Sequence, residues 1–189
     1  MEHDTSQVTD TVTVTAGYQR PDGDRTGIKG WVTVTVVGPD GQIRHREEGP
    51  NLVTQVGDQI YGERGAGVSG AAAVPTGMRL GTGSTAAAKT GAGAAIVTYV
   101  TGSNRAFDAT YPSSALNGSA RRITYVATWA AGTATATGIA EAVITNETPL
   151  TDVTGTAANT MARVVLSSTV NKGASDSLVI TWTHDALGA

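Results

Sequence analysis

The chain has 189 residues, of which 15% are charged, and a net charge of −3, which favours one domain with an extension. No basic stripe is visible, so no nucleic-acid partner is expected, and no apolar run of about 18 residues predicts a membrane span. The absence of cysteine excludes disulfides, thiolate metal sites and cysteine nucleophiles.

The first predicted element is a short strand at residues 11–15, "TVTVT". Its strict alternation places Val12 and Val14 on one face, which is typical of a half-buried strand. The following "GYQRPDGDRTG" has no periodicity and is rich in turn residues, so it predicts a loop or linker. We therefore interpret residues 1–28 as an N-terminal arm and linker, and residues 29–189 as a β-rich domain. An isolated strand needs a sheet edge, either of its own domain or of a neighbouring subunit.

A hairpin is predicted from about Lys29 to Glu48. "WVTVTV" at residues 31–36 alternates in the same way as the arm strand, with three valines on one face. "GPDGQ" is a turn, because Pro39 presets its own φ and Gly41 tolerates a positive one. "IRHREE" then predicts the return strand.

One short helix is predicted at about residues 51–63. Asn51 can cap it, and its apolar face would contain Leu52, Val53, Val56 and Ile60. Gly65 is a suitable end. The interior glycine at position 57 costs about 1 kcal/mol relative to alanine, so the helix must depend on tertiary packing.

The rest of the chain is a series of strand candidates separated by turns. "GMRLGTG" predicts a short strand, residues 94–102 fit a strand or a short helix equally well, and residues 104–117 predict a long loop with at most one short strand. Four longer candidates begin near Arg121, Thr137, Asn159 and Ser175. This rhythm predicts a mainly β fold, a β-sandwich or jelly-roll-like domain.

The segment from Gly83 to Thr90, "GSTAAAKT", lies one residue from the phosphate-loop pattern G-x-x-x-x-G-K-[ST]. The glycine that should precede the lysine is Ala88, and "GAGAAI" follows where a helix should begin. An ordinary loop after a strand is the better interpretation of this segment.

No other catalytic pattern is convincing. His184 lies near the chain end, where fraying is common, and His45 lies among charges on a hairpin strand, so both are expected at the surface. "PDGDRTG" lacks the spaced oxygens of a calcium loop. We expect no catalytic residue, cofactor or metal, and we expect the three tryptophans to serve core or interface packing.

Four blocks of sequence follow one another between residues 50 and 184: "NLVT…GDQIY", "GMRLGTGSTAAAKTG", "ARRITYVATWAAGTATATGIAEAVITN" and "TMARVVLSSTVNKGASDSLVITW". Their order resembles a group of tailed-bacteriophage virion proteins. The last two blocks carry most of the specificity. The arm and hairpin before residue 50 and the loop at 104–117 depart from the shared plan.

This resemblance implies a β-rich structural protein of a phage particle, made in the host cytoplasm and without enzymatic activity. The first hypothesis is a capsid decoration (cement) protein that binds the major capsid protein on the outer surface of the shell, as a homotrimer. The alternative is a binding module of a tail fibre or baseplate. The contact candidates lie in the arm and linker: Val12, Val14, Tyr18, Arg20 and Arg25.

Overall fold

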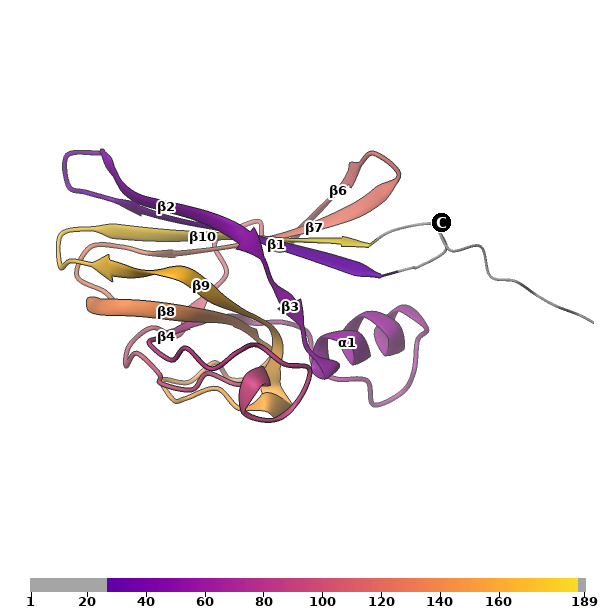
Figure 1. Cartoon of the computed structure of the whole chain (residues 1–189). Helices are drawn as coiled ribbons and strands as arrows, with labels where there is room; N and C mark the ends of the chain where they lie inside the picture. The colour runs from indigo at the N-terminus through magenta and orange to yellow at the C-terminus, as the bar shows by residue number, and fades with distance from the viewer. Residues whose placement is uncertain (1–26, 187–189) are drawn as a thin grey trace, which may run out of the picture.

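A computed structural model describes residues 27–186, and these residues form a sandwich of two antiparallel five-stranded sheets (Figure 1). In spatial order, sheet A contains β2 (Ile43–Pro50), β1 (Ile28–Val37), β10 (Ser177–Ala186), β7 (Ala120–Trp129) and β6 (Ser113–Asn117). Sheet B contains β3 (Leu52–Val53), β9 (Thr160–Lys172), β8 (Ala136–Thr145), β4 (Gly77–Gly81) and β5 (Arg105–Ala106). The predicted mainly β, sandwich-like fold is confirmed.

The first and last strands of the described chain lie side by side in sheet A. Ile28 of β1 is opposite Ala186 of β10, and the ladder continues along both strands to Val37 and Ser177. β10 in turn pairs with β7, so it occupies the middle of the sheet. The hairpin predicted from Lys29 to Glu48 is confirmed as β1 and β2, joined by a turn in which Gly41 has a φ of 76°.

The core lies between the two sheets and is built from the alternation seen in the sequence. Val32, Val34 and Val36 point inward, whereas the threonines between them face outward on sheet A. Trp129 and Trp182 are the largest fully buried side chains, and the Trp129 indole N–H donates to the Ser103 carbonyl at 2.8 Å. Buried indoles need such a partner, because an unpaired N–H in the core is costly.

The helix begins later than predicted. α1 (Gln55–Gly65) is capped by Thr54, whose hydroxyl accepts from the Gly57 N–H. The prediction of a start at Asn51 was wrong, because Leu52 and Val53 form β3 and pair with β9. Their apolar character suits a sheet edge as well as a helix face, and periodicity cannot separate the two over so few residues. The predicted end at Gly65 is confirmed.

Gly57 has a reason to lie inside α1. A Cβ at this position would come within 2.3 Å of the Met161 carbonyl oxygen, so only glycine allows the first turn to approach β9 so closely. The helix thereby covers one end of the sandwich (Figure 1). Residues 94–102, which the pattern left open, hold neither a strand nor an α-helix. Ala94 ends a short 3-10 turn, η1 (Gly91–Ala94), and Tyr99 makes a single antiparallel bridge with Gly81.

Candidate functional site

The loop that resembles a phosphate loop is wrapped around a carboxylate instead. After β4, the backbone N–H of Gly83 donates to Oε1 of Glu141 on β8 at 3.0 Å, and a Cβ on Gly83 would lie 2.6 Å from that oxygen. Lys89 binds Asp58 of α1, with its Nζ 2.7 Å from Oδ2. The glycine and the lysine therefore attach the loop to the sandwich, and the four-residue η1 follows where a phosphate loop requires a full helix.

Glu141 is the centre of a buried polar network between β8 and β9. Its Oε1 accepts from three backbone N–H groups, those of Gly83, Val97 and Thr98, each at 3.0 Å. Its Oε2 accepts from two guanidinium nitrogens of Arg163, at 2.7 and 3.1 Å. The carboxylate is thus fully satisfied, which is what makes a buried charge tolerable. The network holds the loops at 82–98 in place.

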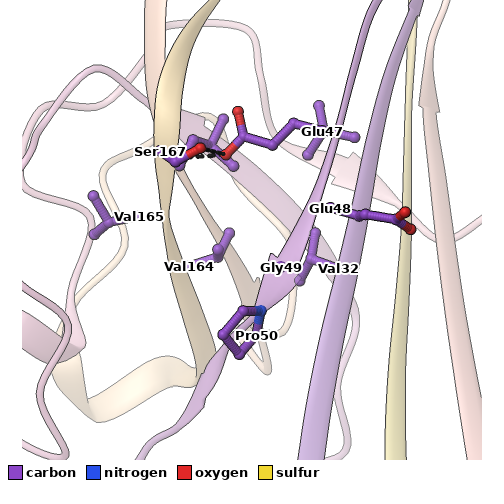
Figure 2. Close-up of a pocket in the computed structure, with 10 residues that line it drawn as sticks. Val32, Glu47, Glu48, Gly49, Pro50, Val164, Val165 and Ser167 are labelled. Atoms are coloured by element: carbon purple, nitrogen blue, oxygen red, sulfur yellow. Dashed lines mark hydrogen bonds between the residues drawn. The ribbon is translucent and has the colours of Figure 1, made fainter.

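A cavity of about 220 Å³ lies between the sheets where β2 faces β9 (Figure 2). Glu47 reaches across its mouth to the bulged part of β9, whereas Glu48 points away on the other side of β2 (Figure 2). The Glu47 carboxylate accepts from the backbone N–H and the hydroxyl of both Ser167 and Ser168, at 2.6 to 3.2 Å. Burial alone would raise the pKa of Glu47, but these hydrogen bonds outweigh it and hold the pKa below its ordinary value.

All four Glu47 contacts keep the carboxylate ionised and paired, so it is poorly suited to act as a general acid or base. Apart from Glu47, Glu48 and Ser167 the lining is apolar, with valines of β1 and β9 on opposite sides. The cavity is small compared with ordinary ligand sites of about 300–1,000 Å³. We interpret the cavity as the space that remains where Glu47 of β2 closes the open edge of the sandwich against β9.

His184 lies in the core, and the expectation that it would be a frayed surface residue was wrong. It has no exposed surface, because β10 continues to Ala186 between β1 and β7. Its Nδ1 is 2.7 Å from the Tyr61 hydroxyl on α1, and its Nε2 is 3.1 Å from the Trp182 Nε1. Tyr61 also lies 3.1 Å from the Tyr125 hydroxyl, so the cluster joins α1 to sheet A.

The partners of His184 fix its protonation. An indole N–H only donates, so Nε2 must accept and Nδ1 carries the proton that is donated to Tyr61. Burial lowers the pKa of His184 to about 4, and burial raises the pKa of both tyrosines. At neutral pH the cluster is therefore uncharged, with His184 and Tyr125 buried and Tyr61 partly buried, which suits a structural role.

A surface groove of about 500 Å³ lies beside Trp31, at the end of sheet A where β1 begins. We call it the Trp31 groove. Trp31 is 47% exposed, in contrast to the two core tryptophans, and Pro50 lies opposite it on β2. An ion pair bounds the groove on β10 and β7, with the Arg122 Nε 2.7 Å from Asp185 Oδ1. Hydrogen bonding to Arg122 holds the pKa of Asp185 below its ordinary value. Tryptophan and arginine together are typical of protein-binding surfaces.

The contact candidates from the sequence, Val12, Val14, Tyr18, Arg20 and Arg25, all lie outside the described residues. From the sequence, the three tryptophans were expected either in the core or at an interface, and the prediction did not say which tryptophan belongs to which group. The alternation does separate them: Trp31 falls on the threonine face of its strand. Reasoning from the sequence also missed Glu141 and Arg163. The signal for this pair is one charge in each of two apolar strands, "GIAEAVIT" and "TMARVVL".

No protein-family model, no curated protein and no solved structure matches this chain. Within residues 27–186, no group of three or more His, Cys, Asp or Glu side chains is placed to hold a metal ion. In the same part of the chain, no helix has the length and apolar character needed to cross a membrane.

Proposed function

We propose that the protein is a structural protein of a tailed-bacteriophage virion, which decorates the outer surface of the major capsid shell and stabilises it without catalysing a reaction. Two kinds of support converge. The resemblance of residues 50–184 to phage virion proteins rests on the sequence blocks quoted above. The β-sandwich is the kind of fold those blocks imply.

The observation that carries a binding role is Trp31. A tryptophan buries a large area on association, and it is under-used when nearly half of its surface stays in water. Its position beside the ion pair of Arg122 and Asp185 gives the groove an apolar centre and a charged rim. We propose that the groove and the arm and linker residues Tyr18, Arg20 and Arg25 contact the major capsid protein, and that the protein acts there as a homotrimer. Val12 and Val14 form the apolar face of the predicted arm strand, which needs a sheet edge to cover it.

Copy number per particle tests the location. Densitometry of purified virions should find hundreds of copies if the protein decorates the head. A handful to dozens of copies would favour the tail-fibre or baseplate alternative, and the absence of the chain from virions would overturn the proposal.

A binding assay tests the surface. The full chain should co-sediment with shells that lack it, and Trp31→Ala should weaken binding at least tenfold, by the ordinary cost of losing an interface tryptophan. Thr33→Ala, on the same face of β1, is the matched control and should bind as the full chain does. Removal of residues 1–26 should abolish binding if the arm is also used. Equal binding by all these proteins would contradict both contact surfaces.

A further inference from the structure

The strand β6 is an unprotected sheet edge. All five of its residues, Ser113–Asn117, are exposed, and within the described residues its only strand partner is β7. The segment contains no charge and no proline, the usual devices that blunt an edge. The opposite edge of sheet A is different, because β2 carries five charged or ionisable side chains and is tied to β9 through Glu47. The β6 edge therefore lacks the protection that the other edge has.

Leu116 marks the face of β6 that lacks cover. It is 72% exposed, and its register with Arg121 places it on the same side of sheet A as Ile123 and Tyr125. That side faces the core farther along β7, but the β6–β7 hairpin extends beyond the second sheet (Figure 1). The outer side of the hairpin is tied down, since the Asn117 amide donates to Asp185 at 3.1 Å. An added strand would cover Leu116 if it carried apolar side chains on the core side.

The first residue of β1 lies in the same row of laterally paired residues as Leu116 on the β6 edge. Ile28 is opposite Ala186, Ala186 is opposite Arg121, and Arg121 is opposite Leu116. With strands about 4.8 Å apart, a strand added to β6 would lie about 19 Å from β1. The N-terminal end of β1 is thus within about 19 Å of the position that a strand added to β6 would occupy.

From these observations we propose that residues 11–15 of the arm pair antiparallel with β6 of the same chain, as a sixth strand of sheet A. The segment "TVTVT" has the length of β6, no charge, and two valines on one face. A register of Val12 with Leu116 and Val14 with Ser114 aligns five residues with five and directs both valines to the core side. The outward threonines then continue the threonine-rich outer face of the sheet.

The linker has the length that this pairing requires. In this register Thr15 lies beside Ser113, which is in the row of Trp31, so the linker must cover about 22 Å to Ile28. The twelve residues between them span up to about 43 Å when extended, and a coil of this length has an r.m.s. span of about 20 Å. A tether so well matched gives an effective concentration in the millimolar range. At micromolar protein, pairing within one chain therefore prevails over pairing with a second copy.

Disulfide trapping tests the pairing, and the chain has no native cysteine to interfere. Val12→Cys with Leu116→Cys places two thiols on the same face of paired strands, within bonding range. Thr13→Cys with Leu116→Cys is the control, because its thiols point to opposite faces. In a glutathione buffer, the first pair should form a disulfide within one chain at least tenfold more readily than the control. Equal formation by both, or a covalent dimer from the first, would overturn the proposal.

Amide hydrogen exchange gives a second readout that needs no crosslink. Peptides covering Ser113–Asn117 should exchange at least tenfold faster in Val12→Asp/Val14→Asp than in the unaltered chain, because the β6 amides that face away from β7 lose their acceptors. Val8→Asp, outside the predicted strand, should leave exchange unchanged. Equal β6 exchange in all three proteins would refute the pairing, as would a change confined to residues 28–31 of the Trp31 groove.

Discussion

Arg163 on β9 and Glu141 on β8 are diagonal neighbours in the ladder and form an ion pair with a closest N–O distance of 2.7 Å, and neither side chain has any exposed surface. The carboxylate also accepts from the backbone of two separate loops, so the pair links the sheet to the loops that follow β4. Many buried ion pairs could be replaced by apolar residues without loss, but removing one partner alone leaves a charge in the core.

We expect Glu141→Gln to lower the free energy of unfolding by roughly 3–5 kcal/mol, because it leaves the Arg163 charge buried without a counter-ion. Denaturant unfolding followed by tryptophan fluorescence measures this. Asp58→Asn is the control, since its pair with Lys89 is about half exposed on both sides and should be worth less than about 1 kcal/mol. Similar losses in the two variants would mean that the buried pair does not hold the loops.

Stability should fall on mild acidification because of His184. The unfolded chain takes up a proton on this residue near pH 6.5, whereas the folded protein does so only near pH 4. The contribution of neutral His184 to the free energy of unfolding is therefore complete above pH 6.5. It decreases as the pH falls from 6.5 to 4, by about 3 kcal/mol in total. The pKa values of Glu47 and Asp185 lie below their ordinary 4.5 and 3.8, so the loss above about pH 5 reports on His184.

Unfolding free energies measured at pH 7.5, 6.5 and 5.5 give this dependence. His184→Gln should flatten it, whatever its effect on stability at neutral pH. Thr33→Ala, which removes no titratable group from β1, should leave the slope unchanged. A slope that survives in His184→Gln would assign the acid sensitivity to another group.

Two glycines of α1 should respond in opposite directions to alanine. Gly57→Ala should destabilise the protein by about 1–3 kcal/mol, because its Cβ would lie 2.3 Å from the Met161 carbonyl oxygen and force the helix away from β9. Gly62→Ala meets nothing within 4 Å and should stabilise by about 0.5–1 kcal/mol through helix propensity. Thermal unfolding of the two variants compares them directly, and stabilisation by Gly57→Ala would contradict the close approach.

Glu47 and Glu48 are neighbours in sequence with different roles. Glu47→Ala removes four hydrogen bonds to Ser167 and Ser168 and should cost about 1–3 kcal/mol. Glu48→Ala, whose side chain points away from the cavity (Figure 2), should change stability by less than about 0.5 kcal/mol. Urea unfolding of the two variants is the measurement, and an equal effect would mean that the closure of the open edge adds nothing.

The long strands could be predicted because their side chains alternate without interruption. Val32, Val34 and Val36 on β1 and Leu178, Ile180 and Trp182 on β10 all face the core, as the period of two requires. The helix start could not be predicted, because the two apolar residues of β3 also fit a helix face. Their pairing with β9 depends on residues more than a hundred positions away.

The interior polar residues were harder to predict for a related reason. His184 lies five residues before the last residue, and nearness to the end suggested fraying. Its burial depends on the strand order, which places β10 between β1 and β7. Glu141 and Arg163 likewise become partners only when β8 and β9 pair. Strand order is a property of the whole chain, and local patterns do not contain it.

The central place of β10 has a consequence for synthesis on the ribosome. Sheet B is complete in sequence by Lys172, but β1 and β7 share no ladder of their own and meet only through residues 177–186. Until that segment has emerged, β1 with β2 and β7 with β6 are two separate hairpins with bare apolar faces. A stop codon that removes only the last dozen residues should therefore yield an aggregating product rather than a slightly weakened one.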